Sequence, residues 1–467
     1  MSFVGLYTGL SGIRASQTGI DTAANNVSNA ATPGYTRQRV ELTPAHSFAS
    51  PVGQIGTGVD VAGIARLRDT FLDDRYRAAI GDHGRADTIA DLLARAEQLT
   101  GEPDHGIASR LPALWEAAET WANDPADPVA RRQVLAELAS VADGVRTVAG
   151  AWDALAVDAA DRLETVAATA SDRLAVLHDL NQRLVGADPA RVGPELLDQR
   201  DQLLDEIASL TGARIRIDVD GRATAEVDGM SLLDADGPAT LEVVDGLVVG
   251  QPPDGGATHQ LAGIGGEVGG LQSALVELLP GLRDELDHFT RSVADAINAV
   301  NEGGRHPDGT PGAPLLGYDP DDPAGTLALV TDDPAALAAA LADPGDPGAP
   351  AAPHDGSNAR ALADLRTTPV LGPGEPADQA SSIEHRLADL VTGLAGDVRT
   401  WKANADAVRS VYKGAELARA AEHGVSIDEE MVDLVRYQRS LEAASRVMTT
   451  VDEALDVLVN RTGIVGR

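Results

Sequence analysis

The chain has 467 residues, which is too many for one hydrophobic core, so we expect several modules. Its formal net charge of −35 opposes binding to nucleic acid or to an anionic membrane surface, because such binding depends on Lys and Arg that neutralise phosphates. The absence of cysteine excludes disulfides, thiolate metal sites and a cysteine nucleophile, and the aromatic content of 3% favours helices that pack through small and aliphatic side chains.

The first segment, residues 1–60, begins with an apolar repeat. Apolar residues recur three or four positions apart, which predicts a helix with a coiled-coil seam. The N-terminus lacks the basic and continuous apolar regions of a cleaved secretory signal, and no stretch of the sequence has the length and apolarity of a membrane span. The residues expected to carry the seam contacts are Leu6, Leu10, Ile13 and Ile20.

A polar turn, AANNVSNAATPGYTRQ, follows this helix. Asn25, Asn26 and Asn29 suit the last turns of a helix, because Asn tolerates the left-handed conformation and its amide can bond nearby backbone groups. Pro33 restricts the residue before it to an extended form, and Gly34 allows the turn. An isolated Thr-Pro-Gly turn is more often an ordinary helix stop, so this stretch alone does not indicate a function.

Residues 61–211 are predicted to form a helical rod domain, and residues 85–211 are nearly all helical in pattern. Pro and Gly interrupt the pattern at GEPDHG, NDPADP and GADPARVG, where helices stop or start. Between the last two interruptions, the stretch from Val129 to Val185 is long enough for an extended helix.

Two insertions follow the first part of the rod. Residues 212–262 contain RIRIDVDGRATAEVDGMSLL, in which apolar residues alternate in twos around two Asp-Gly pairs; this pattern predicts hairpins and a small β insertion. The helical pattern of the rod domain continues over residues 263–301. Residues 302–378 are rich in Pro, Gly and Asp and predict a second, loop-rich insertion.

The last two segments are helical again. Residues 379–423 predict the return helix of the rod domain, and residues 424–467 predict a second coiled-coil helix. Ser426, with Glu429 three positions later, predicts a capping box at its start. Because this helix repeats the apolar spacing of the first, we expect the two to pair. Its seam positions are Leu434, Tyr437, Leu441, Met448, Val451, Leu455 and Leu458.

The expected fold is therefore mainly α. It is an elongated helical rod whose N- and C-terminal helices pair as a coiled coil, with a small β insertion and a loop-rich insertion.

The sequence carries no motif of a catalytic site. No two of the ten histidines have the short spacing of a shared metal site, and no GxSxG, P-loop or complete GxGxxG occurs. The nearest stretch, GIGGEVGG at 263–270, is interpreted as a flexible joint before a helix, and the Asp-Gly pairs as turns rather than calcium sites. We expect neither an enzyme nor a bound metal or cofactor.

Both ends of the chain resemble one known group of proteins. TGLSGIRASQTGIDTAANNVSNAATPGYTRQRVEL is similar to the N-terminal signature of bacterial flagellar rod, hook and hook-associated proteins, and GVSIDEEMVDLVRYQRSLEAASRVMTTVDEALDVLV to their C-terminal signature. The middle, with NDPADPVARRQVL, LLDQRDQLLDEIASLTG and GGLQSALVELLPGLRDELDHFTRSVADAINAVN, resembles the helical domain of the members found at the junction of hook and filament. The two insertions look short for that family.

The resemblance implies a structural role. Subunits would form a homo-oligomeric ring, with the hook protein on one side and hook-associated protein 3 on the other. They would reach this extracellular site unfolded through the flagellar type III export channel, after release from a chaperone that binds the C-terminal region. The terminal helices would line the central channel.

The resemblance also gives the polar turn a role as a joint between layers and subunits. We expect its asparagine amides to bond the backbone of neighbouring subunits. The residues of the joint would be Asn25, Asn26, Asn29, Thr32, Pro33, Gly34 and Tyr35.

Other functions stay open at this point. A hook protein, a rod protein or hook-associated protein 3 has similar ends. From another class, an adhesin or enzyme could be displayed through residues 302–378, although no catalytic constellation occurs there.

Overall fold

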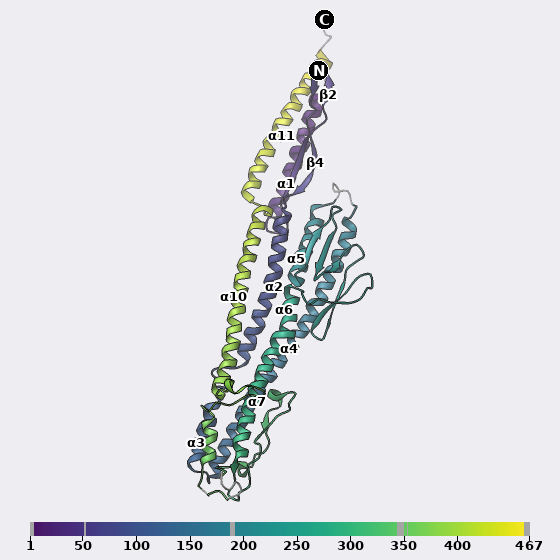
Figure 1. The fold of residues 1–467 in the computed structure, drawn as a ribbon. Coiled ribbons are helices and arrows are strands. Elements are labelled where there is room, and N and C mark those ends of the chain that lie inside the picture. The colour runs from purple at the N-terminus through teal and green to yellow at the C-terminus, as the bar shows by residue number, and fades with distance from the viewer. Residues whose placement is uncertain (1–3, 51–52, 187–191, 343–349, 353, 462–467) are drawn as a thin grey trace.

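The protein is an elongated, mainly helical molecule in the computed structural model, which describes residues 4–50, 53–186, 192–342, 350–352 and 354–461. The terminal helices α1 and α11 pair at one end, α2 and α10 run along the middle of the rod, and α4 and α7 reach the other end, where α3 lies (Figure 1). This architecture confirms the expected fold class. Residues 1–3 and 462–467 of the predicted terminal segments, and residues 343–349 and 353 of the loop-rich insertion, lie outside the described residues.

Most of the rod consists of a few long helices. The stretch expected to form one extended helix is α4, which begins after the N-cap Asp127 with a proline in its first turn. In chain order, the α helices are α1 (Val4–Asn29), α2 (Thr70–Leu99), α3 (Leu111–Asn123), α4 (Pro128–Leu184), α5 (Pro194–Thr211), α6 (Gly266–Ser273), α7 (Leu279–Gly303), α8 (Pro323–Thr326), α9 (Ser357–Asp364), α10 (Ile383–His423) and α11 (Ile427–Asp456).

Short antiparallel sheets account for the strands. The small β insertion holds two of them, with strand orders β5-β6-β7 and β10-β9-β8, and β1-β4, β2-β3, β11-β14 and β12-β13 are two-stranded. The strands are β1 (Gln38–Pro44), β2 (Phe48–Ser50), β3 (Gly53–Ile55), β4 (Val59–Arg66), β5 (Arg214–Ile217), β6 (Ala223–Val227), β7 (Met230–Leu233), β8 (Thr240–Val244), β9 (Leu247–Gln251), β10 (His259–Gln260), β11 (Gly304–Arg305), β12 (Leu316–Gly317), β13 (Ala328–Leu329) and β14 (Ala340–Leu341).

The hairpins expected at the two Asp-Gly pairs are present. β5 pairs with β6, and β6 with β7, on either side of these turns. Asp228 and Gly229 both have positive φ, 52° and 78°, as a two-residue type I′ turn requires.

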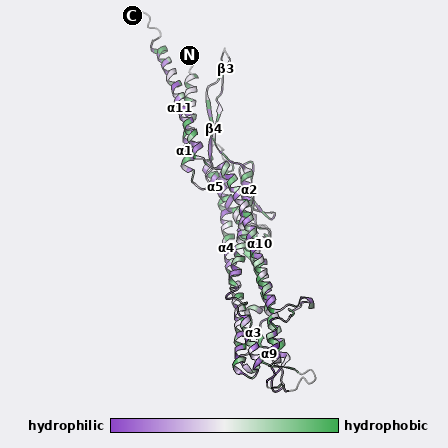
Figure 2. Ribbon diagram, turned by 90° about the vertical axis from the view of Figure 1, so that its left-hand side faces the viewer, coloured by the Kyte–Doolittle hydropathy of each residue, from purple (hydrophilic) through white to green (hydrophobic). Residues whose placement is uncertain are grey.

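A ribbon between α1 and α2 was not predicted. β1 and β4 pair along its length, and β2 and β3 form its tip, which projects beside α1 (Figure 2). The predicted segment boundary at residue 60 therefore falls inside β4. The signal is weak because the ribbon has solvent on much of its surface, so few of its residues need to be apolar.

The core runs along the rod and includes the bundle in which α3 packs on α4 and α9. Trp115 and Trp121 of α3 are fully buried there. Trp152 of α4 is also buried, and its indole N–H donates to the Ala96 carbonyl oxygen at 2.9 Å, so its polar edge is satisfied. Aliphatic and small side chains fill the remainder, as the composition predicts.

The glycines at 263–270 are a packing point and not the flexible joint that we expected. They bring the start of α6 against the end of α5 and against α2. A Cβ added at Gly266, which has a φ of +61°, would lie 2.4 Å from the Leu210 carbonyl carbon, and one at Gly270 would lie 2.9 Å from the Arg85 carbonyl oxygen. The backbones touch, so only glycine fits.

Candidate functional site

The terminal helices meet along a seam of small residues on α1. The seam residues recur at heptad spacing, so they share one face of the helix. A Cβ added at Gly19 would lie 2.6 Å from the ring of Tyr437, and one at Gly9 would lie 2.7 Å from Met448 Cγ, so each larger side chain of α11 occupies the space above a glycine. The contacts are Gly5 with Val451, Gly9 with Met448, Gly12 with Ala444 and Gly19 with Tyr437.

The aliphatic stripe predicted on α1 lies beside the glycine seam. Each seam glycine directly precedes a residue of the predicted stripe. One residue turns the helix by about 100°, so the stripe lies to one side of the glycine contacts, and its own part in the seam stays a prediction. Leu10 is 36% exposed and the other three are half-buried. The predicted residues concerned are Leu6, Leu10, Ile13 and Ile20.

On α11, all the predicted seam positions except the last are half-buried. Leu458 lies beyond the end of α11, in the π-helical turn η4 (Val457–Arg461), and is 42% exposed. The predicted positions that are half-buried are Leu434, Tyr437, Leu441, Met448, Val451 and Leu455.

Asn26 links three parts of the chain where α1 nears its end. Its side chain is 1% exposed, and its amide nitrogen donates to the Gln38 carbonyl oxygen and to Glu430 Oε2, both at 2.9 Å. Its amide oxygen accepts from the Gln38 N–H at 3.0 Å and from the Tyr35 hydroxyl at 2.8 Å. Burial, with nearby carboxylate charges, raises the pKa of Tyr35 to about 12, so the hydroxyl keeps its proton and remains a donor.

The other two asparagines are bonded locally. Asn29 donates to Asn25 Oδ1 at 2.9 Å, Asn25 donates to the Tyr35 hydroxyl at 3.4 Å, and Thr32 donates to Asn29 Oδ1 at 3.2 Å. The expectation that these amides bond the backbone of neighbouring subunits stays a prediction. They satisfy groups of their own chain at the point where α1 ends and the turn begins.

The turn itself is held against α5. Gln202 of α5 donates from its amide nitrogen to the Pro33 carbonyl oxygen at 2.7 Å. Gly34 has a φ of +75°, and a Cβ there would lie 1.8 Å from the same amide nitrogen. Both the conformation and the space at this position require glycine.

Arg37 connects the turn to the start of α11. Its Nε donates to Glu430 Oε1 and its Nη1 to Glu429 Oε2, each at 2.6 Å. The capping box is formed in one direction: Ser426 Oγ accepts from the Glu429 N–H at 3.5 Å, but the Glu429 carboxylate binds Arg37. The carboxylates at the start of α11 thus serve as ligands of an arginine as well as partners of the helix dipole.

Below the turn, a buried network of arginines and aspartates joins β4 to α2 and α5. Arg66 Nη1 lies 2.7 Å from Asp198 and 2.8 Å from Asp201, both on α5. Arg68 binds Asp201 at 2.8 Å and Asp73, on α2, at 2.5 Å. Each buried charge has opposite charges beside it, which a buried ion needs.

The charge state of this network follows from its geometry. Burial alone would raise the pKa of Asp201, but the guanidinium groups of Arg68, Arg200 and Arg66 outweigh burial and hold the pKa below its ordinary value. Asp201 therefore stays ionised at neutral pH and keeps its ion pairs with the arginines.

His423, at the break between α10 and α11, lies beside the network and bonds two backbone N–H groups. Its carbonyl oxygen accepts from the Arg37 N–H at 3.0 Å, and its Nε2 accepts from the Asp69 N–H at 2.9 Å. Burial lowers the pKa of His423; Asp73, 3.8 Å from Nδ1, opposes this effect, and Arg68 and Arg419 reinforce it. The neutral ring, with Nε2 as acceptor, is the form that fits.

Comparison with known proteins places these features in a family. The flagellar hook-associated protein FlgK helical domain matches residues 93–316, the flagellar basal body rod FlgEFG protein C-terminal region matches residues 422–461, and the flagella basal body rod protein region matches residues 6–36. Flagellar hook-associated protein 1 of Bacillus subtilis is 27% identical over an alignment that covers 100% of this chain and 99% of that protein. These matches, which together extend along the whole chain, support its recognition as a flagellar hook-associated protein 1.

Other hook-associated protein 1 sequences match parts of the chain. The Salmonella typhimurium protein is 25% identical over 65% of this chain and 57% of its own length. A solved structure, the flagellar hook junction protein FlgK from Burkholderia pseudomallei, aligns with a TM-score of 0.66 over 76% of this chain and all of that chain. At 15% identity, this match shows the shared fold.

Hook-associated protein 1 is a structural component of the flagellum. Within the ranges that the structure describes, no three His, Cys, Asp or Glu side chains lie close enough to share a metal ion. None of the described helices combines the length and apolarity needed to cross a membrane.

The arginine–aspartate network was not predicted from the sequence. Its members come from three segments, around residues 66–73, 198–205 and 419–423, and no spacing in the sequence shows that they meet. The signal present was local: charged residues recur within apolar helical patterns, as in LLDQRDQLLDE, where solvent exposure is the ordinary explanation.

Proposed function

We propose that this chain is a self-assembling structural subunit at the junction between the flagellar hook and filament. The similarity to hook-associated protein 1 supports this role, and one observation on the chain itself carries it. Among the 30 residues of α11, only Glu430 is buried. A helix of that length with so little buried surface needs further partners, because tertiary packing provides most helical stability in proteins.

The apolar side chains left exposed identify the surface that other subunits would cover. On α11, Val432 is 68% exposed, and Val435 and Val447 are also exposed; on α1, Tyr7 and Leu10 are exposed. Apolar side chains grouped in this way indicate a protein interface. The aliphatic stripe of α1 thus becomes part of the contact between subunits, beside the small-residue seam that pairs α1 with α11.

The joint gives this subunit its geometry. Arg37, Asn26 and the buried network link the paired terminal helices to the rod through many charged contacts. We propose that this linkage fixes the angle between an inner layer of paired helices and an outer layer of rods. A fixed angle would allow one ring of subunits to join a flexible hook to a stiff filament.

The finer assignments are part of the same proposal. We propose a homo-oligomeric ring with the hook protein on one side and hook-associated protein 3 on the other, export without a cleaved signal peptide through the type III channel, and a chaperone on the C-terminal region before export. Residues 61–211, 263–301 and 379–423 would act as one rod domain, with residues 212–262 and 302–378 as insertions.

Electron microscopy of a deletion strain tests the proposal. We expect intact hooks without filaments, and filament subunits in the medium. Absent hooks would favour a hook or rod protein. Normal filaments that lack only attachment to surfaces would favour an adhesin displayed on a flagellar scaffold.

A further inference from the structure

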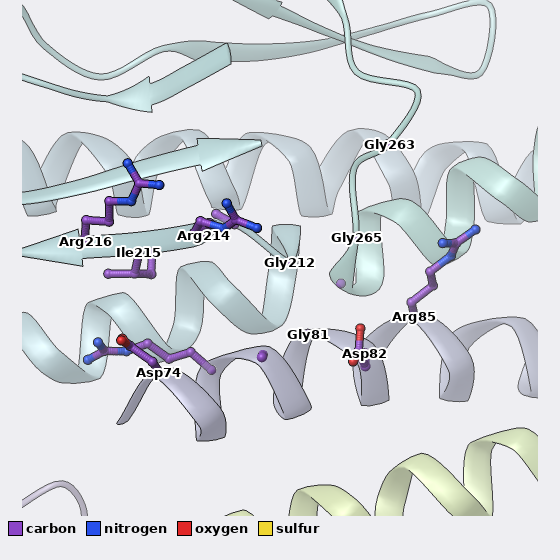
Figure 3. Close-up of a pocket in the computed structure, with 14 residues that line it drawn as sticks. Asp74, Gly81, Asp82, Arg85, Gly212, Arg214, Ile215, Arg216, Gly263 and Gly265 are labelled. Carbon is purple, nitrogen blue, oxygen red and sulfur yellow. The ribbon is translucent and has the colours of Figure 1, made fainter. Parts of the chain in front are cut away.

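A cleft of about 580 Å³ lies where α2, β5 and the start of α6 meet (Figure 3). It lies outside the joint described above, and the proposed function does not use it. Charged residues from two elements line it: Asp74, Arg77, Asp82 and Arg85 from α2, and Arg214 and Arg216 from β5.

The cleft is hollow because glycines form its wall. Gly81, Gly212, Gly263, Gly265 and Gly266 all line it. The three elements approach through their backbones, so that a Cβ at Gly212 would lie 2.7 Å from Gly265 Cα. Close packing therefore excludes side chains from the wall, and the space between the arginines stays open.

The arginines of the cleft have few carboxylate partners of their own. Arg77 is bound to Asp205 at 2.9 Å, but the one side-chain bond of Arg85 goes to the Ser273 hydroxyl at 3.1 Å. Arg214 and Arg216 form no ion pair within the described part of the chain. They alternate with a buried residue on β5, so they lie on one face of the strand (Figure 3).

The charge of the cleft is opposite to that of the molecule. Four arginines and two aspartates line it, in a chain that has 72 acidic and 37 basic residues. Arg214 and Arg216, which have no ion pair among the described residues, can accept an added carboxylate, because guanidinium binds carboxylates through short, often bidentate hydrogen bonds. The cleft therefore suits an acidic segment.

We propose that this cleft binds the carboxylates of an acidic loop of a second copy of this chain. The inference rests on the proposed function, because a self-assembling subunit presents both surfaces in every copy. The turn between β12 and β13 is the acidic segment that we assign. Asp319 and Asp321 are exposed there and have no basic partner among the described contacts, whereas Asp322 is bound to Arg283.

The positions of cleft and turn suit a contact between successive subunits. α2 and α6, which contribute residues to the cleft, lie nearer the terminal helices than α7 does, and Asp322 of the turn binds Arg283 of α7, toward the end formed by α3 (Figure 1). Two complementary surfaces at different heights on one subunit produce a head-to-tail contact, which repeats along an assembly.

Titration of the purified full-length chain with a synthetic peptide tests the inference. The peptide LGYDPDDP corresponds to residues 316–323, and a second peptide carries Asn in place of each Asp. We expect the acidic peptide to bind and the Asn peptide not to bind. The double variant Arg214→Gln/Arg216→Gln should weaken binding by about tenfold or more, because two charge-assisted hydrogen bonds are lost.

Arg360→Gln is the matched control, because Arg360 is an exposed arginine on α9, outside the cleft. Its affinity should equal that of the wild type, and circular dichroism should show that every variant is folded. Equal affinity of the wild type and the double variant, or no binding at all, would overturn the inference. Inorganic phosphate that binds as tightly as the peptide would show a small-anion site instead.

The titration uses monomers, so its failure leaves the junction role intact. The junction role is tested separately by the deletion strain.

Discussion

Asn26 is a single side chain on which the geometry of the joint depends. Its side chain makes four hydrogen bonds in the interior: two to the backbone of Gln38 on β1, one to the Tyr35 hydroxyl and one to Glu430 in the first turn of α11. An amide is suited to this position because it donates and accepts at once without a charge of its own. The neighbouring asparagines show the contrast, since their bonds stay within the turn.

Asn26→Ala should therefore loosen the joint even in the isolated chain. The substitution leaves the Gln38 backbone groups and a Glu430 oxygen without their partner, which costs about 1–3 kcal/mol for a buried group. Hydrogen exchange should accelerate in the first residues of β1 and in the first turn of α11. Asn29→Ala is the control, and equal exchange in the two variants would show that Asn26 has no special role.

The joint should also weaken in mild acid because of His423. Its pKa in the folded chain is depressed below the ordinary value of 6.5, chiefly by burial, so the unfolded chain binds the proton more readily. The stability that the neutral His423 ring contributes is fully present above pH 6.5, and it is lost as the pH falls toward the pKa of His423 in the folded chain. The free energy of opening, from hydrogen exchange between residues 423 and 434, should fall between pH 7.5 and pH 5.5.

His423→Gln should flatten this pH dependence, because glutamine keeps an acceptor for the Asp69 N–H and does not titrate. An unchanged slope in this variant would assign the pH dependence to other groups.

At the scale of the elements, the sequence predicted the helices well and their contact face less well. The extents of α4, α10 and α11 follow from Pro, Gly and capping residues. The glycines of the α1 seam were not predicted because an apolar pattern indicates Leu and Ile. A glycine becomes a contact residue only when a large partner such as Tyr437 fills the space above it. The joint depends on contacts between distant segments, for which one sequence carries no signal.

Gly19→Ala tests the small-residue seam. The added methyl group would lie 2.6 Å from the Tyr437 ring, so α1 and α11 must separate or the ring must move. We expect faster hydrogen exchange along α11 from about residue 434 to 451. Gly414→Ala, on α10 with open space around it, should instead stabilise its helix by about 0.5–1 kcal/mol. If both variants behave alike, α1 does not pack through its glycines.

At the scale of the whole molecule, the rod and the terminal helices differ in how much apolar surface they bury. The rod has its own core, which includes residues from α2 to α10 and contains the buried tryptophans. The terminal helices have almost no core of their own, and they expose apolar side chains that a monomer cannot cover. The high negative charge keeps such monomers apart until specific contacts form, because like charges repel at long range. The rod should therefore fold alone, and the terminal pair should become fully stable only in the assembly.

The central claim is that the exposed apolar face of the terminal helices holds subunits together. Its most direct test compares Val432→Asp with Val157→Asp, since these valines are 68% and 61% exposed, on α11 and on the rod helix α4. Filament attachment is measured in a deletion strain that expresses each variant. We predict that Val432→Asp folds and is exported but leaves hooks bare, with filament protein in the medium, because a charge must be buried without a partner. Val157→Asp should restore filaments. Normal filaments with Val432→Asp, or equal loss with both variants, would contradict the account.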